Sequence, residues 1–275
     1  MSDNPEQAQR SVAVRALGVT VEVRVSGDRA DDVLRRMPLL WEYCAPDAGA
    51  PVRASVDVVF DSDPDAAGRA DSAGSVSRPL LEDLLQVLTQ RITLAAIGAR
   101  AGECLMLHAA CLASPHSSTA AAFVAPGGMG KTTLVSTLGP GRWYVTDETT
   151  VVVEDGTVVP YPKPLSVRRS PDSPFKDETR PSALGLTPPT GTVRLGALCL
   201  LDRDPAHRGT PKIARLDPLD AIVQLVPQTS HLPELTQPLQ RLAALCDSVG
   251  GVHRVTYRES AELAALVDEL TQDKV

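Results

Sequence analysis

The chain has 275 residues, of which 43% are hydrophobic and 22% are charged, and its net charge is −7. This length allows one large domain or two smaller ones, and the composition is ordinary for a globular protein. The acidic balance and the 3% of aromatic residues argue against a nucleic-acid partner, which needs basic groups for its phosphates and rings for its bases. No apolar run approaches the length of a membrane span, so we expect no membrane partner.

The start of the chain and its cysteines predict a compartment. Residues 1–10 are polar and lack the apolar run of a secretory signal. The five cysteines are odd in number and widely spaced, which favours reduced thiols over a disulfide framework or a zinc site. We therefore expect a cytoplasmic protein, and the excess of arginine over lysine hints at a bacterial source.

Residues 1–77 show the patterns of a small α+β module followed by a linker. Alternation of apolar and polar residues predicts strands, and apolar residues at helical spacing predict helices. The elements expected are one or two strands over 11–25, a helix over 31–43 that breaks near Pro38, a strand over 52–60, and a loop rich in Asp, Gly and Ser over 61–77.

Residues 78–275 are expected to form a second, α/β domain with a mixed sheet. A long helix over 79–99 should pack on that sheet, and a mobile loop rich in Pro, Ser and charge is expected over 170–189. The remaining elements expected are strands over 104–113, 119–124, 142–146, 193–201 and 252–257, a hairpin turning at Asp155-Gly156, and helices over 217–225, 237–245 and 260–270.

The segment 125–132, Ala-Pro-Gly-Gly-Met-Gly-Lys-Thr, matches the phosphate-binding pattern G-x-x-x-x-G-K-[S/T] except for Ala125 at its first position. An apolar run of strand length precedes it, and a segment that can form a helix follows it, as such a loop requires. We therefore expect a nucleotide to be bound by Pro126, Gly127, Gly128, Met129, Gly130, Lys131, Thr132 and Thr133.

The residue types explain how this loop would bind ATP and Mg²⁺. Small residues let backbone N–H groups surround a phosphate, and the following helix adds the positive end of its dipole. Lys131 supplies a mobile charge for the β- and γ-phosphate oxygens, and the hydroxyl of Thr132 supplies one Mg²⁺ ligand.

A phosphate loop needs an acidic partner, and two aspartates at the ends of apolar strands are candidates. Asp147, with Glu148 beside it, ends the strand that follows the helix of the loop, whereas Asp202 ends the strand over 193–201. Either could orient the metal or accept the proton of an attacking hydroxyl, and short connectivity favours Asp147. His108 interrupts an apolar strand just before the loop, where a histidine of the core and a functional histidine are both consistent with the pattern.

Residues 107–169 resemble the catalytic domain of the HPr kinase/phosphorylase family and its smaller relatives, including kinases encoded beside lasso peptides. The shared features are Leu107-His108-Ala109, the loop ending Gly128-Met129-Gly130-Lys131-Thr132, the strand Trp143-Tyr144-Val145-Thr146 with its paired acids, and the proline-containing segment 158–167. The resemblance extends more loosely to the C-terminus. It implies a P-loop fold of the HPr-kinase and phosphoenolpyruvate-carboxykinase type.

The resemblance also implies roles for individual residues. Lys131 and Thr132 would bind ATP and Mg²⁺, Asp147 would be the general base, Glu148 would assist the metal, and His108 would lie near the transferred phosphoryl group. The family's loop serine is Gly127 here, its second acid is Glu148 rather than aspartate, and its later glutamate-containing signature is missing. These departures weigh against the HPr protein as acceptor. They also weigh against the family's reverse reaction, in which the phosphorylase activity removes the phosphoryl group.

The function expected is a kinase that transfers the γ-phosphoryl group of ATP to a serine-like hydroxyl of a peptide, a protein or a small molecule. True HPr kinases assemble into oligomers, so the resemblance leaves a homo-oligomer open. Two alternatives also stay open: a regulatory module that binds nucleotide without phosphorylating an acceptor, and a simple NTPase that uses Asp202 for its metal.

Overall fold

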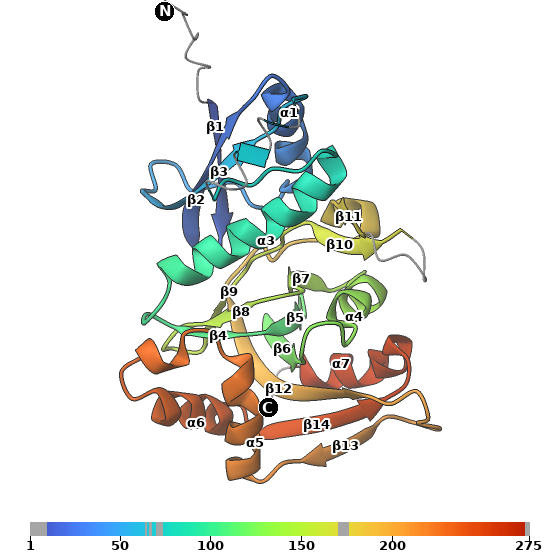
Figure 1. Ribbon diagram of the computed structural model, residues 1–275. Helices are drawn as coiled ribbons and strands as arrows, with labels where there is room; N and C mark the ends of the chain where they lie inside the picture. The colour runs from blue at the N-terminus through green and yellow to red at the C-terminus, as the bar shows by residue number, and fades with distance from the viewer. Residues whose placement is uncertain (1–9, 64, 66–67, 70–73, 170–175, 273–275) are drawn as a thin grey trace, which may run out of the picture. The chain divides into compact units, whose positions relative to one another are not determined.

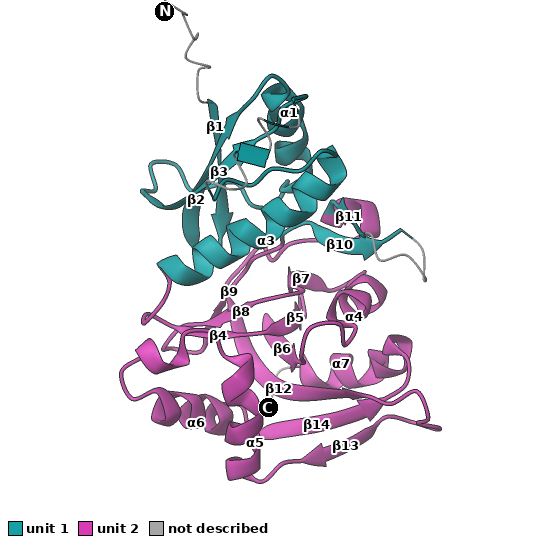
Figure 2. Ribbon diagram, in the orientation of Figure 1, with its two compact units in different colours: residues 1–99, 163–180 teal, residues 100–162, 181–275 magenta. Residues whose placement is uncertain are grey.

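The computed structural model describes residues 10–63, 65, 68–69, 74–169 and 176–272. Its contacts divide the chain into two compact units (Figure 2). The first comprises residues 1–99 and 163–180, and the second comprises residues 100–162 and 181–275. This division differs from the predicted boundary between residues 77 and 78, because a long helix and a later hairpin belong to the first unit.

The first unit is built on a three-stranded sheet in the order β1-β2-β3. Strands β1 (Arg10–Ala16) and β2 (Val19–Ser26) form an antiparallel hairpin, and β3 (Val52–Val59) runs parallel to β2. The parallel pairing requires a crossover, which helix α1 (Ala30–Leu40) provides. These strands confirm the predicted alternation of buried and exposed residues.

The predicted break of α1 near Pro38 was wrong, since the helix includes this proline. Pro38 lies in the last turn, where its missing N–H group removes only one backbone hydrogen bond before the helix ends. Buried Val33 and Met37 hold the helix in the core just before that proline.

Helix α3 (Leu81–Ala99) contacts β2 and β3 with its buried face, so it belongs to the first unit. The prediction assigned this helix to the main sheet. It also contacts the hairpin of β10 (Leu165–Arg168) and β11 (Lys176–Thr179), where the Thr89 hydroxyl donates a 3.0 Å hydrogen bond to buried Glu178. The predicted mobile loop was therefore wrong over 176–179, while its residues 170–175 lie outside the described part of the chain.

The second unit contains a nine-stranded mixed sheet in the order β4-β8-β9-β12-β6-β5-β7, with β14 paired to β12 and β13 (Figure 1). Strands β6, β12 and β14 run parallel to one another, and the other pairings are antiparallel. The strands are β4 (Leu105–Leu107), β5 (Ala109–Ala113), β6 (Thr119–Val124), β7 (Trp143–Thr146), β8 (Thr150–Val152), β9 (Thr157–Val159), β12 (Val193–Arg203), β13 (Lys212–Arg215) and β14 (Val252–Tyr257). This sheet and its helices confirm an α/β fold, including the predicted hairpin at Asp155-Gly156.

The helices of the second unit pack on this sheet. Helices α5 and α6 share a buried core with β4, β6, β12 and β14. Helix α4 contacts β5, and helix α7 contacts β6. The helical segments are α4 (Lys131–Leu138), η1 (Pro181–Leu184), α5 (Pro218–Leu225), η2 (Val226–Gln228), η3 (Leu232–Glu234), α6 (Pro238–Ser248), η4 (Ser260–Leu263) and α7 (Ala264–Leu270). The helix predicted over 260–270 is thus divided into η4 and α7. Among the described residues, no helix combines the length and apolarity needed to cross a bilayer.

The strand predicted over 104–113 is two strands that separate at His108. Strand β4 pairs with β8, whereas β5 pairs with β6 and β7. Because the two strands have different neighbours, His108 lies at a break in the sheet, next to the strand that leads into the glycine-rich loop.

Candidate functional site

The glycine-rich loop joins the end of β6 to the start of α4, so Lys131 and Thr132 are the first two residues of the helix. Gly128 and Gly130 have φ values of 81° and 91°, a left-handed conformation that glycine adopts readily. Helix α4 has no side-chain cap at Gly130 and no acidic residue in its first turn. Its first N–H groups are therefore available to an anion.

The side chain of Lys131 lies against the loop that it follows. Its Nζ donates hydrogen bonds to the carbonyl oxygens of Ala125 at 2.5 Å and Pro126 at 3.1 Å. The residue is only 7% exposed, and this burial lowers the pKa of Lys131 to about 8, against the opposing effect of Asp147 and Glu148. An ammonium group held by neutral carbonyls is well placed to turn toward a phosphate.

Asp147 is buried and contacts the first turn of α4. The Thr132 hydroxyl donates a 2.8 Å hydrogen bond to Oδ2 of Asp147, and the Tyr144 hydroxyl donates a 3.0 Å hydrogen bond to its Oδ1. These two contacts fix the orientation of the carboxylate. The predicted neighbours Lys131, Thr132 and Asp147 are thus brought together in the second unit.

Asp202 is near the same edge of the sheet but has a different partner. Leu200 pairs with Val124, so Asp202 lies beyond the level at which β6 ends. Its exposed carboxylate accepts a 3.1 Å hydrogen bond from the Thr256 hydroxyl of β14. Of the two candidate aspartates, Asp147 is the one that contacts the loop helix.

His108 is half-buried and is anchored through its backbone. Its N–H group donates a 2.7 Å hydrogen bond to the Gln228 carbonyl, and its own carbonyl accepts a 3.4 Å hydrogen bond from the N–H group of Ala125. Burial, followed by the charge of Lys131, lowers the pKa of His108 below 6.5, while Glu148 and Asp147 act in the opposite direction. The imidazole is therefore largely neutral at pH 7.

Glu148 follows Asp147 and is half-buried, and its N–H group donates a 3.3 Å hydrogen bond to the Thr146 hydroxyl. Its charge acts on both Lys131 and His108, which places it in the same electrostatic environment. Asp147 and Glu148 therefore both act electrostatically on the two other candidate groups, Lys131 and His108.

The donor set around Thr132 suits Mg²⁺. In the described part of the chain, no group of three or more His, Cys, Asp or Glu side chains is arranged to hold a metal alone. Mg²⁺ in nucleotide sites usually takes one or two carboxylates, with water and substrate phosphates as its other ligands. The adjacent hydroxyl of Thr132 and carboxylate of Asp147 are hard oxygen donors that fit this arrangement.

No protein-family model and no curated protein sequence matches this chain. The interpretation of the site consequently depends on the geometry described above and on the motif in the sequence.

Two residues of the site were missed in the sequence analysis. Tyr144 lies in an apolar strand three residues before Asp147, and strand alternation alone would place the two side chains on opposite faces. They meet because β7 ends at Thr146 and the chain then turns. Gln228 is far from His108 in the sequence, so no local pattern could have linked them.

The lowered pKa of His108 predicts a loss of stability in mild acid. The unfolded chain binds a proton near pH 6.5 and the folded chain only at lower pH, so stability is present above 6.5 and falls as the pH decreases toward the folded pKa. We expect His108→Gln to show a smaller difference in the free energy of unfolding between pH 7.5 and 5.5, measured with urea. If His108→Gln leaves this difference unchanged, His108 is not the group responsible for the pH dependence. The matched control is His116→Gln, because His116 is exposed.

Proposed function

We propose that this chain is a P-loop kinase of the HPr-kinase-like type, which uses ATP and Mg²⁺ to phosphorylate a serine-like hydroxyl. The acceptor would belong to a peptide, a protein or a small molecule. The observation that carries this proposal is the hydrogen bond between Thr132, at the start of α4, and buried Asp147. It links the phosphate-binding loop to the acid that phosphoryl transfer requires.

The proposed mechanism assigns the phosphates to the loop. The N–H groups of Gly128 to Thr132 and the charge of Lys131 would bind the β- and γ-phosphates, which the open space around the glycines permits. Bound Mg²⁺ would reduce the negative charge of these phosphates, and Thr132 and Asp147 would hold it, with Glu148 assisting.

The proposed transfer step uses Asp147 as the general base. The acceptor oxygen forms a bond to the γ-phosphorus, the bond from that phosphorus to the bridging oxygen breaks, and ADP leaves. The acceptor proton passes to the carboxylate of Asp147, which Tyr144 and Thr132 keep oriented. His108, which its lowered pKa keeps neutral, would lie beside the transferred group as a hydrogen-bonding partner rather than as a charge.

The direct test measures ADP formed from ATP and Mg²⁺ by the purified full chain, with and without serine-containing peptides, free hydroxy amino acids and HPr. A kinase releases ADP only with an acceptor, and that acceptor gains the mass of one phosphate. Tight nucleotide binding without acceptor-dependent ADP across the panel would instead support a regulatory module, and acceptor-independent ADP would support an NTPase.

Asp202→Asn separates the kinase from the NTPase alternative. Because the carboxylate of Asp202 binds Thr256 rather than the loop helix, we expect acceptor-dependent ADP formation to change by no more than about twofold. Steady-state ADP release is the measurement, and Thr256→Val is the matched control for the loss of their hydrogen bond. A loss of activity in Asp202→Asn, but not in Thr256→Val, would reassign the metal aspartate.

A further inference from the structure

The two stretches of chain that carry His108 and the paired acids belong to one interrupted antiparallel ladder. The last pair of β4 with β8 and the first pair of β5 with β7 are Leu107 with Thr150 and Cys111 with Thr146. Between these pairs lie residues 108–110 on one strand and residues 147–149 on the other. Because the two intervals are equal in length, the register is the same on both sides of the interruption, and an unbroken ladder would place Ala109 opposite Glu148.

In an unbroken ladder, Ala109 and Glu148 would exchange two backbone hydrogen bonds. The N–H and C=O groups of His108 bond to Gln228 and Ala125, which belong to neither β7 nor β8. Successive residues of a strand direct these groups to opposite edges, so those of Ala109 are directed toward β7 and β8. Opposing residues whose groups face each other form the hydrogen-bonded type of antiparallel pair.

Side chains take the place of these backbone bonds. The Thr150 hydroxyl donates a 3.0 Å hydrogen bond to the Ala109 carbonyl, and the Glu148 N–H group donates a 3.3 Å hydrogen bond to the Thr146 hydroxyl. The imidazole of His108 hydrogen-bonds the backbone of Glu148, and this bond acts to raise the pKa of His108, as a carbonyl acceptor does. Both threonines are fully buried. Three of the four backbone groups that would close the ladder are thus satisfied while it stays open.

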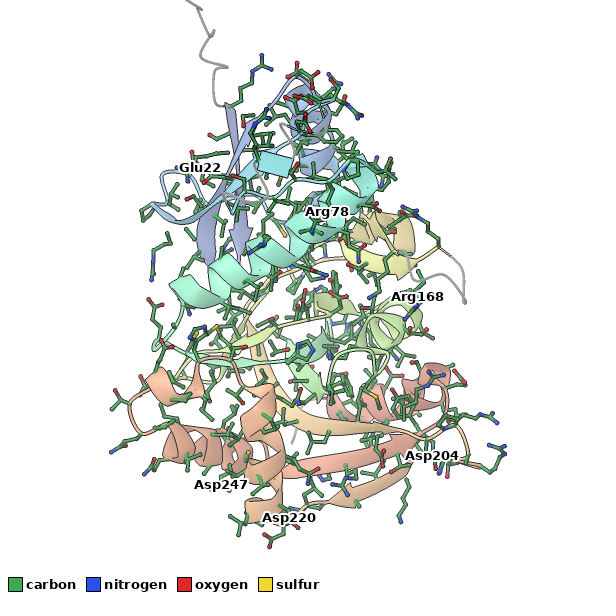
Figure 3. All side chains as sticks on the ribbon, viewed as in Figure 1. Glu22, Arg78, Arg168, Asp204, Asp220 and Asp247 are labelled. Carbon is green, nitrogen blue, oxygen red and sulfur yellow. The ribbon has the colours of Figure 1, made fainter. Side chains whose placement is uncertain are left out.

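The open ladder determines where Asp147 points. In a continuous strand, Asp147 and Tyr144 would lie on opposite faces. Because the ladder is open and the chain turns, the Asp147 carboxylate accepts hydrogen bonds from both Tyr144 and Thr132. Figure 3 shows Asp220 on the outside of the second unit, where it is exposed, whereas Asp147 is only 4% exposed and needs such donors. Closing the ladder would separate this buried carboxylate from them.

We propose that Thr146 and Thr150 are positioning residues for phosphoryl transfer, because their hydroxyls hold the ladder open and so direct Asp147 toward the loop helix. Each acts through the backbone beside Asp147 and His108 rather than on the nucleotide or the acceptor. The inference depends on the proposed kinase function and adds to it two residues that the phosphate-loop motif does not contain.

The first test asks whether the ladder closes when both hydroxyls are removed. Thr146→Val/Thr150→Val keeps the β-branched shape that strands favour, and it removes the partners of two backbone groups that can then bond to each other. In a closed ladder, Ala110 and Asp147 form a pair with Cα atoms about 4.5 Å apart. NMR of the isotopically labelled full chain should therefore show a strong cross-peak between their α-hydrogens in the variant and not in the unaltered chain. Identical spectra for this pair would overturn the proposal.

The second test measures transfer from ATP and Mg²⁺ to the best acceptor of the panel. We expect each single valine variant to lower kcat about fivefold, as for the loss of one hydrogen bond. The double valine variant should lower kcat at least about a hundredfold, because a small misplacement of the reacting groups has that effect. KM for the acceptor and Kd for Mg²⁺-free ADP should change by no more than about twofold, since neither hydroxyl contacts the loop. Thr146→Ser/Thr150→Ser keeps both hydroxyls and should recover kcat to within about threefold of the unaltered chain.

Thr271→Val is the matched control, because the buried Thr271 hydroxyl also donates to a backbone carbonyl, that of Val267 at 2.8 Å, but lies outside the ladder. Its kcat should equal that of the unaltered chain. An unchanged kcat in the double valine variant would overturn the positioning role and leave the kinase intact, and an equal loss in Thr271→Val would do the same.

If the double valine variant does not fold, the single variants decide. Equal kcat for valine and serine at both positions would overturn the proposal, whereas a loss confined to valine would support it. Absence of transfer by the unaltered chain, with every acceptor of the panel, would remove the proposed function itself and the positioning role with it.

Discussion

Asp147→Asn should bind Mg²⁺-free ADP as the unaltered chain does and transfer phosphate at least about a hundredfold more slowly, because it removes the proposed general base and one proposed Mg²⁺ ligand. The substitution removes the charge and basicity of the carboxylate but keeps its shape. The amide that replaces the carboxylate can still accept the hydrogen bond from Tyr144, and the Thr132 hydroxyl can turn to accept one from its NH₂ group. The fold should therefore be retained.

Calorimetric titration with ADP measures nucleotide binding. Acceptor-dependent formation of ADP from ATP and Mg²⁺ measures phosphoryl transfer. Tyr144→Phe is the companion variant, because it leaves the Asp147 carboxylate charged and removes only one of its hydrogen bonds. We expect its activity to fall by about fivefold, in line with a net contribution near 1 kcal/mol. Full activity of the Asp147→Asn variant would refute the assigned role.

Local sequence patterns predicted the elements of this fold well, because they depend on neighbouring residues. The alternation over 11–25 and 52–60 predicted strands β1, β2 and β3, and the apolar spacing over 79–99 predicted α3. The partner of α3 was missed for a physical reason. An apolar face shows that a helix is buried on one side but does not identify the sheet against which it packs.

The hairpin of β10 and β11 shows a second limit of sequence patterns. The segment Lys176–Thr179 is rich in charge, which predicts an exposed loop. Glu178 is nevertheless buried, because the hydroxyls of Thr89 and Ser166 donate hydrogen bonds to it. Thr89 is 89 residues away in the sequence, so only the folded chain shows that this charge has partners.

The proximity of the candidate residues was easier to predict than the contacts that hold them in place. The spacing of Lys131, Thr132 and Asp147 follows from a strand, a loop, a short helix and another strand, all connected locally. The contacts that orient these residues come from elsewhere, as the Gln228 carbonyl at His108 shows. A sequence motif contains the residues expected to bind or react. The residues that hydrogen-bond to them come from distant parts of the chain and depend on how the chain packs.

Lys131→Ala should weaken nucleotide binding by about 10- to 150-fold, the range expected for losing hydrogen bonds from a charged donor to phosphate. Transfer should fall further, because the γ-phosphate gains charge as its bond to ADP breaks. Lys212→Ala, an exposed lysine on β13, is the matched control and should have no effect on either quantity.

The pKa of about 8 makes the role of Lys131 testable through pH as well. Phosphate binding favours the charged form of the side chain, so binding above pH 8 requires uptake of a proton. We expect the Kd for ADP to be nearly constant between pH 6.5 and 7.5 and to rise by up to about tenfold per pH unit above pH 8.

The Lys131→Ala variant should lose this upward slope, because it has no ammonium group to lose. Calorimetric titration in two buffers of different ionisation enthalpy should show proton uptake at pH 8.5 for the unaltered chain and none for the variant. Equal slopes in the two proteins would mean that another group titrates, and Lys131 would then not be the residue that contacts the phosphates. A slope confined to the unaltered chain connects the burial of one lysine directly to nucleotide binding.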